Sequence, residues 1–467
     1  MFVKQLYTNC LSEAAYFIES EGEAVVIDPL RDIDAYLDLA KERNATIKYI
    51  FETHFHADFV SGHLDLAAAT QAPIVYGPEA VTSFPIYKAA DGEEFNIGKL
   101  RLQVIHTPGH TLESTCYLLL DEQGQPASLF TGDTLFVGDV GRPDLFSGNL
   151  TKEELAGLLF DSLNNKIKTL PDNVTVYPAH GPGSSCGKNL GPNTFSTLGE
   201  EKATNYALLA NDKASFIAEV TDGLTTPPSY FPINARINKE GYDALQAVME
   251  KSNHPLSVAE FKAKVKEGIM ILDTRPATEF ADGFVPGSLS IGLEGRFAEW
   301  AGSLLNFEQE IVLVTSPGQE EETIVRLARV GFDHVVGFLK GGYEAWVAAG
   351  ERRDMIINVE PDELAMDIPH DPNLVIVDVR KPAEFADGHI KDALNLTLSD
   401  MTDPGNLGDF DENHNLYVHC QGGYRSIIAC SLLKREGIHN LRNVEGGFNN
   451  MKGTKGLEVV KEKNVLN

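Results

Sequence analysis

The stretch Thr53-His54-Phe55-His56-Ala57-Asp58 directly follows the strand-like run Tyr49–Glu52 and brings two imidazoles and a carboxylate into one turn. Further groups of this kind stand beside Gly or Pro at the ends of later strand-like runs. They are His110 in Thr-Pro-Gly-His-Thr, Asp133 in Phe-Thr-Gly-Asp-Thr and His180 in Tyr-Pro-Ala-His-Gly. A lone His is more often a core or surface residue than a ligand, but this recurrence at strand ends predicts a metal site.

Short apolar runs alternate with turns throughout residues 1–245, and several of them end at a His or Asp. The runs predicted as strands are 23–28, 47–52, 74–76, 100–106, 116–120, 128–131 and 175–177. This pattern predicts a strand-rich first domain over residues 1–245, with the metal site where its strands end.

An internal repeat organises the remainder of the chain. Leu272–Gly283 (LDTRPATEFADG) recurs 105 positions later as Val377–Gly388 (VDVRKPAEFADG), and the same offset carries Gly341-Gly342-Tyr343 onto Gly446-Gly447-Phe448. In each copy a helical pattern precedes an apolar strand that ends in Asp, and further strands and helices alternate after it. The repeat therefore predicts two α/β domains with parallel sheets, over 255–355 and 358–467.

The loop His419–Ser426 (HCQGGYRS) distinguishes the second copy. Cys420 follows a strand and precedes a helix expected to begin at Ile427, so backbone N–H groups and the positive end of a helix dipole should surround its sulfur. Such surroundings stabilise a thiolate, and Arg425 adds positive charge. The residues expected to cradle the outer sulfur of a persulfide are Gln421, Gly422, Gly423 and Tyr424.

The equivalent loop of the first copy, Val314–Glu321 (VTSPGQEE), contains no cysteine. Whether Thr315 or Ser316 is set against Cys420, no thiol stands there, and acidic residues replace Arg425. A persulfide carrier is excluded in this domain, and we expect it to be a structural spacer that positions its neighbour.

Composition narrows the classes of function. The formal net charge of −29 argues against nucleic acid and an anionic membrane as partners, because the average surface field would repel both. The sequence shows no run long and apolar enough for a transmembrane helix and no signal-peptide pattern at its start, which favours a cytoplasmic protein. The five cysteines are scattered and odd in number, so they do not suggest a disulfide framework.

The metal-site motifs resemble the metallo-β-lactamase fold superfamily, whose pattern is His-x-His-x-Asp-His followed by His, Asp and His on later loops. The resemblance implies an αββα sandwich. Binuclear members hold a second metal with the His that follows the Asp, and Phe59 stands at that position here. This implies that Asp58 and His180 make no normal second site, which weakens the interpretation as a binuclear zinc hydrolase.

What remains suits one metal. His54, His110 and Asp133 would form the two-imidazole, one-carboxylate triad of non-haem iron(II) oxygenases, so we expect one Fe(2+) per chain, with Zn(2+) as the alternative. The other groups of these loops would orient ligands, handle protons or serve as an alternative metal site; they are His56, Asp58 and His180.

Within the superfamily, these motifs together with Gly141-Arg142-Pro143-Asp144 are similar to the persulfide dioxygenase family, the ethylmalonic-encephalopathy protein type. The resemblance implies that Arg142 binds the anionic part of a thiol persulfide; a salt bridge to Asp144 is the alternative. It also implies a homo-oligomer, a dimer or larger. Cys186, near His180, is either a persulfide acceptor whose thiol pKa Lys188 lowers, or an ordinary loop residue.

The last domain resembles the rhodanese family over 358–467. Its motifs are Cys-x4-Arg from Cys420 to Arg425, Asp378-Val-Arg380 and Gly388-His-Ile. Tyrosine- and arsenate-phosphatase relatives use a longer Cys-x5-Arg loop, so sulfur transfer is favoured over phosphatase action.

These resemblances together imply an iron persulfide dioxygenase that converts thiol persulfide and O2 to sulfite and thiol, coupled to a sulfurtransferase that forms or uses thiosulfate. Two other classes stay open. One is a zinc-dependent thioester hydrolase of the glyoxalase II type, and the other is a non-catalytic sulfide or redox sensor that uses Cys186 and Cys420 as reporters.

Overall fold

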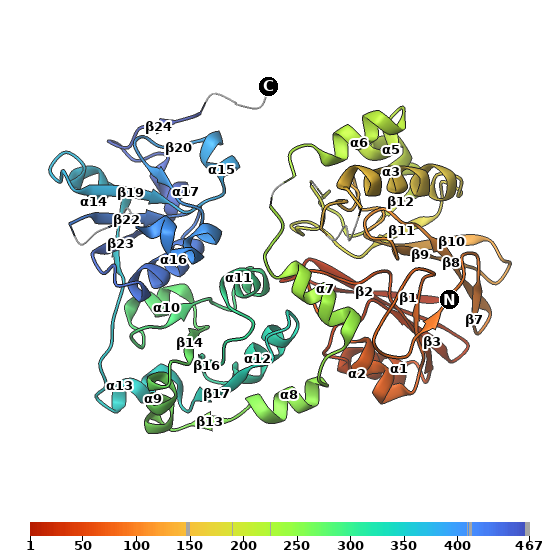
Figure 1. Cartoon of the computed structure of the whole chain (residues 1–467), viewed down its shortest axis with the longest axis horizontal. Coiled ribbons are helices and arrows are strands. Elements are labelled where there is room, and N and C mark those ends of the chain that lie inside the picture. Colours follow the sequence, from red (N-terminus) through yellow and green to blue (C-terminus); the bar gives the residue numbers. More distant parts are fainter. Residues whose placement is uncertain (146–149, 189, 225, 409, 411–412, 463–467) are drawn as a thin grey trace. The chain divides into compact units, whose positions relative to one another are not determined.

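The computed structural model describes the whole chain except residues 146–149, 189, 225, 409, 411–412 and 463–467 (Figure 1). The last five residues of the third expected domain therefore lie outside the described residues. The chain divides into two compact units. The first is Met1–Val248 with Leu327–Phe332, and the second is Met249–Arg326 with Asp333–Asn467. Both copies of the repeat therefore fall in the second unit, except for Leu327–Phe332 of the first copy.

The first unit contains two six-stranded sheets. One has its strands in the order of the chain: β1 (Phe2–Thr8), β2 (Glu13–Ser20), β3 (Glu23–Ile27), β4 (Thr46–Phe51), β5 (Ile74–Tyr76) and β6 (Tyr87–Lys88). The other runs, from edge to edge, β12 (Ser196–Thr197), β11 (Thr175–Pro178), β10 (Pro126–Gly132), β9 (Thr115–Leu120), β8 (Leu100–His106) and β7 (Glu94–Ile97).

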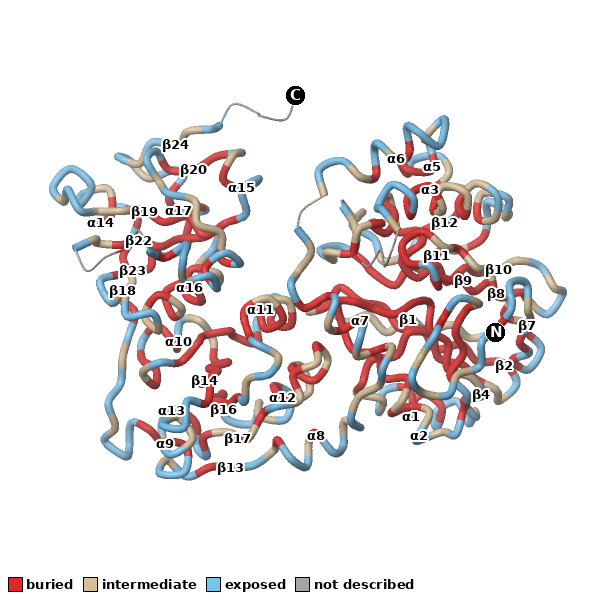
Figure 2. Tube along the Cα trace, viewed as in Figure 1, coloured by how far each residue is buried: buried red, intermediate tan, exposed pale blue. Residues whose placement is uncertain are grey.

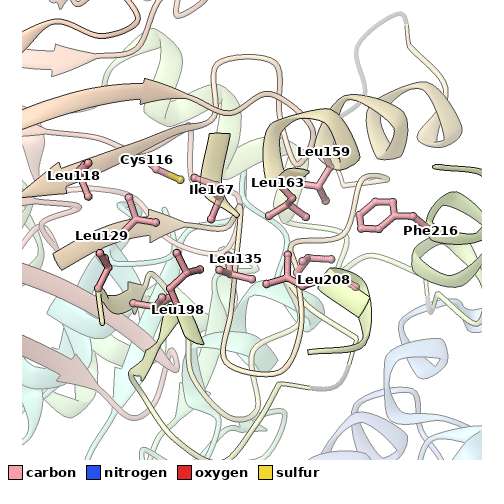
Figure 3. Packing of buried hydrophobic residues seen from close by; sticks show 14 of the residues in the cluster. Cys116, Leu118, Leu129, Leu135, Leu159, Leu163, Ile167, Leu198, Leu208 and Phe216 are labelled. Atoms are coloured by element: carbon pink, nitrogen blue, oxygen red, sulfur yellow. The ribbon is translucent and has the colours of Figure 1, made fainter. Parts of the chain in front are cut away.

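Every residue of β2 and β9 is buried, and Figure 2 shows long stretches of the strands of the first unit in red. In β9, Tyr117 and Leu119 pack in the core between the sheets, whereas Leu118 and Leu120 pack in a second core. Figure 3 shows that second core, where Leu118 and Leu129 face side chains from the covering helices. Because alternate residues serve different cores, a fully apolar run such as β9 is stable, and truncating one such Leu to Ala would cost about 2–5 kcal/mol.

Helices complete the four layers. α1 (Asp34–Glu42) and α2 (His63–Thr70) contribute to the core on the first sheet, and α3 (Lys152–Ser162) and α6 (Lys213–Thr221) to the core on the second. The expected αββα sandwich is confirmed. The remaining helices are η1 (Leu163–Ile167), α4 (Leu198–Thr204), α5 (Tyr206–Leu209), α7 (Phe231–Glu240) and α8 (Leu245–Ser252). Among the described residues, no helix has the length and hydropathy needed to span a membrane.

The second unit contains two parallel five-stranded sheets with corresponding strand orders. The first sheet is β13 (Pro255–Leu256), β17 (Val335–Leu339), β16 (Ile311–Val314), β14 (Met270–Asp273) and β15 (Leu289–Ser290). The second is β18 (Ile357–Val359), β23 (Leu441–Val444), β22 (Asn415–His419), β19 (Leu374–Asp378) and β21 (Leu394–Asn395). The parallel α/β fold expected from the repeat is confirmed.

Helices surround both sheets. In the first copy they are α9 (Val258–Lys266), α10 (Ala277–Asp282), α11 (Phe297–Leu304), α12 (Glu320–Ala328) and α13 (Gly342–Ala348). In the second they are α14 (Pro361–Asp367), α15 (Pro382–Asp387), α16 (Tyr424–Arg435) and α17 (Gly447–Met451), with η2 (Leu398–Thr402) and η3 (Pro404–Leu407). A short ladder pairs β20 (His389–Ile390) with β24 (Val459–Val460).

The sheet register identifies the residue that replaces Cys420 in the first copy. Asp273 pairs with Val314, and Asp378 pairs with His419. The next residue along each central strand is Thr315 in the first copy and Cys420 in the second. Thr315 is therefore the structural counterpart of Cys420.

Candidate functional site

The predicted metal-binding triad comes together at strand ends of the first unit. His54 follows β4, His110 lies in the loop after β8, and Asp133 follows β10. His110 Nε2 is 3.4 Å and His54 Nε2 is 3.8 Å from Asp133 Oδ2. Each residue is 2% exposed, and their potential ligand atoms all lie within 4.8 Å of one another. The structure thus brings these three groups into one metal-sized cluster.

Hydrogen bonds orient both imidazoles toward Asp133. His110 Nδ1 is 2.9 Å from the carbonyl oxygen of Arg142. Because a carbonyl oxygen can only accept a hydrogen bond, His110 Nδ1 carries the hydrogen. The Thr53 hydroxyl donates to Asp28 Oδ2 at 2.8 Å and accepts from His54 Nδ1 at 2.9 Å. The Nε2 lone pairs of both rings are therefore free to face a metal ion.

The chemistry of this cluster fits a cation. Both Asp133 oxygens and His180 Nε2 are buried without a hydrogen-bond partner. Burial and the neighbouring imidazoles hold the pKa of His54 well below its usual value, so the ring is neutral, as a metal ligand must be. A bound cation would supply the missing partner for these buried groups.

A second group of potential ligands lies beside the first. His56, Asp58 and His180 place ligand atoms within 4.8 Å of one another. His180 Nε2 is 3.5 Å from Asp58 Oδ2 and 3.5 Å from Asp133 Oδ1, so Asp133 adjoins both groups. Phe59 is buried against the His56 ring, with centroids 4.3 Å apart, and supplies no ligand. His56, Asp58 and His180 are the three residues that we expected from the sequence to orient ligands, handle protons or form an alternative metal site, and that role stays a prediction.

Sequence reasoning missed the acidic partners of His56. His56 Nε2 lies 3.1 Å from Asp28 Oδ1 and 3.6 Å from Glu52 Oε2, and these three side chains form another buried cluster. Burial and the Asp28 carboxylate raise the pKa of Glu52 well above its usual value. Both acids end runs that the sequence predicted as strands, which is the one signal that could have identified them.

Cys186 lies next to this site, in surroundings that favour the neutral thiol. It is 1% exposed and forms a potential ligand group with Asp133 and His180. Burial, followed by the Asp58 and Asp133 carboxylates, raises the pKa of its thiol well above the usual value. The expectation that Lys188 lowers this pKa is wrong, because the Lys188 ammonium donates to the carbonyl oxygen of Glu219 instead.

Arg142 forms the salt bridge that was the alternative to anion binding. Its Nε and Nη2 donate to the two carboxylate oxygens of Asp144, at 2.8 Å and 2.7 Å. The residue is 4% exposed, and Nη1 is 3.5 Å from the carbonyl oxygen of Ser185. Its backbone carbonyl contacts the triad through His110.

The predicted sulfur-transfer loop joins β22 to α16 in the second unit. Cys420 is 2% exposed, and the Gly423 N–H donates to its Sγ at 3.1 Å. The helix begins at Tyr424, three residues earlier than predicted, because Gly423 adopts a left-handed conformation (φ 110°) and caps it directly. Tyr424 and Arg425 therefore lie in the first helical turn.

The repeated Gly-Gly-aromatic motif, Gly446–Phe448 in this copy, packs against the backbone of the loop. The Phe448 N–H donates to the Cys420 carbonyl at 2.7 Å, and the Asn449 N–H donates to the Gln421 carbonyl at 3.1 Å. Gly447 has φ 55°, and a Cβ there would overlap the Cys420 carbonyl group. Only glycine allows this close approach, which explains why the motif recurs at the repeat offset.

The cations next to the loop are paired with acids. Arg425 donates to both oxygens of Glu384, at 2.7 Å and 2.8 Å. Arg380 pairs with Asp378 at 2.7 Å and donates to Gln421 Oε1 at 3.0 Å. The positive charge expected from Arg425 is thus partly offset by Glu384.

Known families match both units. The metallo-beta-lactamase superfamily matches residues 8–181, and the rhodanese-like domain matches residues 257–349 and 360–454. The chain therefore belongs to the metallo-beta-lactamase superfamily through its N-terminal part, which two rhodanese-like domains follow.

Individual relatives match different lengths of the chain. The probable hydroxyacylglutathione hydrolase glo2 of Schizosaccharomyces pombe is 31% identical over 159 residues, which are 33% of this chain and 57% of that protein. A crystal structure of a metallo-beta-lactamase from Staphylococcus aureus subsp. aureus COL is 35% identical, with a TM-score of 0.65, over 73% of this chain and 98% of that one. ETHE1 from Myxococcus xanthus is 31% identical, with a TM-score of 0.45, over 51% of this chain and 98% of that one.

Proposed function

We propose that this chain is an iron-dependent persulfide dioxygenase coupled to a sulfurtransferase. The overall reaction of the first unit would be thiol persulfide plus O2 plus water giving thiol plus sulfite. The observation that carries the proposal is the buried cluster of His54, His110 and Asp133 in a chain that also presents a Cys420 loop. Two imidazoles and one carboxylate suit Fe(2+), which when bound would supply electrons to O2 and polarise the persulfide sulfur.

Residues of this chain would orient the metal ligands, hold a proton and exclude water at this site. Thr53 and the Arg142 carbonyl hold the two imidazoles with Nε2 toward the metal position. His180, whose Nε2 lies 3.5 Å from both Asp58 and Asp133, is placed to hold or move a proton at that nitrogen. Burial of all these groups excludes bulk water from the reacting sulfur.

Cys420 would then transfer sulfur. Its thiolate takes the outer sulfur of a second thiol persulfide, and sulfite attacks that sulfur to form thiosulfate and release the thiolate. The Gly423 N–H and the start of α16 favour the anionic sulfur in both steps. We propose this direction of flow; the reverse, in which thiosulfate loads Cys420, uses the same residues.

A zinc-dependent thioester hydrolase is the second candidate. It is favoured by the relatives named hydroxyacylglutathione hydrolase, although the chain spans less than two thirds of the first of them, and by the adjoining His56, Asp58 and His180 group. A binuclear centre needs such a second group.

Metal analysis and O2 uptake separate the two candidates. The full chain is purified without O2, its iron and zinc are measured, and O2 consumption is followed after a thiol persulfide is added. The dioxygenase predicts about one iron per chain and persulfide-dependent O2 uptake that Asp133→Asn abolishes, whereas the exposed-site control Asp91→Asn retains it. Zinc-loaded protein that hydrolyses thioesters and consumes no O2 would contradict the proposal.

A further inference from the structure

A cavity of about 350 Å³ in the second unit lies against the Cys420 loop. Gly422, Gly423 and Tyr424 of the loop form part of its wall. Thr278 and Glu294 of the first, cysteine-free copy form another part. A molecule in this cavity would therefore contact both the sulfur-carrying loop and the repeat that cannot carry sulfur.

The cysteine-free copy is fixed directly to the helix that follows Cys420. The Tyr424 hydroxyl donates to the Gly292 carbonyl at 2.8 Å, and the Ser290 N–H donates to Ser431 Oγ at 3.0 Å. β15 and α10 of the first copy both pack against α16. The first copy thus forms a defined wall of the cavity rather than only a spacer.

The charged groups that line the cavity are acidic. Two carboxylates, Glu294 and Glu445, line it together with the amides of Asn358 and Asn443. Among the described residues that line it, none is Lys, Arg or His. Partial desolvation and the neighbouring Glu445 carboxylate raise the pKa of Glu360, consistent with crowded negative charge on this side.

The nearby cations do not reverse this charge. Arg380 and Arg425, on the other elements around the loop, form ion pairs with Asp378 and Glu384. Arg326, which donates to the Leu293 carbonyl next to Glu294, is paired with Glu322. An anionic ligand in the cavity would meet two carboxylates without a lining cation, whereas a ligand ammonium group would be attracted by both.

We propose that this cavity binds the organic part of the persulfide that loads Cys420, and that it selects thiols carrying a protonated amine over anionic thiols. The inference rests on the proposed sulfurtransferase function and names its donor class. The Cys420 thiolate attacks the outer sulfur of R–S–SH, and the sulfur–sulfur bond breaks. The thiolate R–S⁻ leaves with the electron pair, and the outer sulfur keeps its proton as Cys420–S–SH, so there is no net oxidation.

The expected selectivity is moderate because both carboxylates are exposed. Exposed ion pairs change an equilibrium or rate by about twofold to fivefold each, so two of them predict roughly a tenfold preference for the amine-bearing donor at low salt. High salt should reduce the preference by screening.

The test measures loading of Cys420 by mass spectrometry of the full chain without O2, so that the first unit cannot consume the donor. Two donors of similar size are compared, cysteamine persulfide (cationic) and 3-mercaptopropionate persulfide (anionic). Their intrinsic reactivities cancel when the ratio of loading rates is compared between variants. Glu294→Lys should lower the ratio of cationic to anionic loading about tenfold, and Glu294→Gln about threefold.

The control is Glu308→Lys, an exposed residue of the same copy outside the cavity, which should leave the ratio unchanged. An unchanged ratio in folded Glu294→Lys overturns the inference; Glu294→Gln decides if the lysine variant does not fold. Equal sensitivity to Glu308→Lys also overturns it, because the effect would then come from overall charge. If neither donor loads Cys420 in the wild-type chain, the sulfurtransferase proposal itself fails.

Discussion

The two rhodanese-like copies differ in the loop that follows the central strand, Thr315–Glu320 in the first copy and Cys420–Arg425 in the second. An Asp–Arg ion pair and an aromatic ring beside this loop are present in both. In both, an Asp at the end of the strand next to the central one (β14 or β19) pairs with an Arg two residues later, at 2.6 Å for Asp273–Arg275 and 2.7 Å for Asp378–Arg380. Both arginines also lie over an aromatic ring, Tyr343 at 4.2 Å in the first copy and Phe448 at 4.1 Å in the second.

The loops themselves have opposite chemistry. The first copy has Thr315 where the second has Cys420, and α12 begins with Glu320, whereas α16 carries Arg425 in its first turn. Pro317 stands where the second copy has Gly422 and offers no N–H group. The comparison teaches that the Asp–Arg pair belongs to the fold, whereas sulfur transfer depends on the loop.

The largest effect is expected from Cys420→Ser. Removing the nucleophile should reduce sulfur transfer from an organic persulfide to cyanide by about 1,000-fold or more. Thiocyanate formation measures this directly. Cys430→Ala, in the helix α16 that follows the Cys420 loop, should retain the activity because burial raises the pKa of the Cys430 thiol and disfavours a thiolate there. Substantial thiocyanate formation by Cys420→Ser would show that another group carries the sulfur.

The Asp–Arg ion pair that both copies share should contribute about equally to the free energy of unfolding in each copy. Asp273→Asn and Asp378→Asn each leave a buried guanidinium without its charge partner, which should cost about 3–5 kcal/mol. Urea unfolding measures the loss. Only Asp378→Asn should also slow Cys420 loading, because Arg380 donates to Gln421 in the loop. Equal slowing by Asp273→Asn would contradict the assignment of this pair to the fold.

A smaller difference between the two copies is expected in how far acid pH lowers the free energy of unfolding. Burial alone would raise the pKa of Glu384, but the hydrogen bonds and charge of Arg425 lower it below the usual 4.5. A lowered pKa in the folded state adds stability above about pH 4.5 that is lost as pH falls through the folded value. Glu384→Gln should remove roughly 1 kcal/mol at pH 7 and flatten this slope.

Glu279→Gln is the matched control, since the first copy has Glu320 at the position of Arg425. Urea unfolding of both variants at pH 7 and pH 4 makes the comparison. The same acid slope in Glu384→Gln and wild type would mean that the Arg425 pair contributes nothing to stability.

The smallest effect is expected from Thr315→Cys. Introduced beside Cys420→Ser, it should restore less than about 1% of sulfur transfer, because Pro317 replaces Gly422 and an acidic residue, Glu320, replaces Arg425. Thiocyanate formation again gives the readout. Recovery of more than a tenth of the activity would show that a cysteine alone is sufficient in this frame.

The sequence predicted the positions of strands and domains better than the contacts between side chains. Strand positions placed His54, His110 and Asp133 at strand ends, and the repeat placed Cys420 on its loop. The orientation of His56 toward Asp28 was not predictable, since those residues meet only through the pairing of β3 with β4. The start of α16 depended on the left-handed backbone at Gly423.

Charge states were harder still to predict. Lys188 is only two residues from Cys186 in sequence, yet the pKa of that thiol follows its burial and the carboxylates of Asp58 and Asp133, which come from distant loops. The pairing of Arg142 with Asp144 was foreseen only as one of two alternatives. Long-range packing, which short motifs do not encode, determines these properties.

The most direct test of the account follows the products formed from a thiol persulfide and O2 by the full chain, with wild type and Cys420→Ser compared. The account predicts equal O2 uptake, with thiosulfate as the product of wild type and sulfite as the product of the variant. Thiosulfate formed by Cys420→Ser at the wild-type rate, or no O2 uptake by either protein, would contradict it.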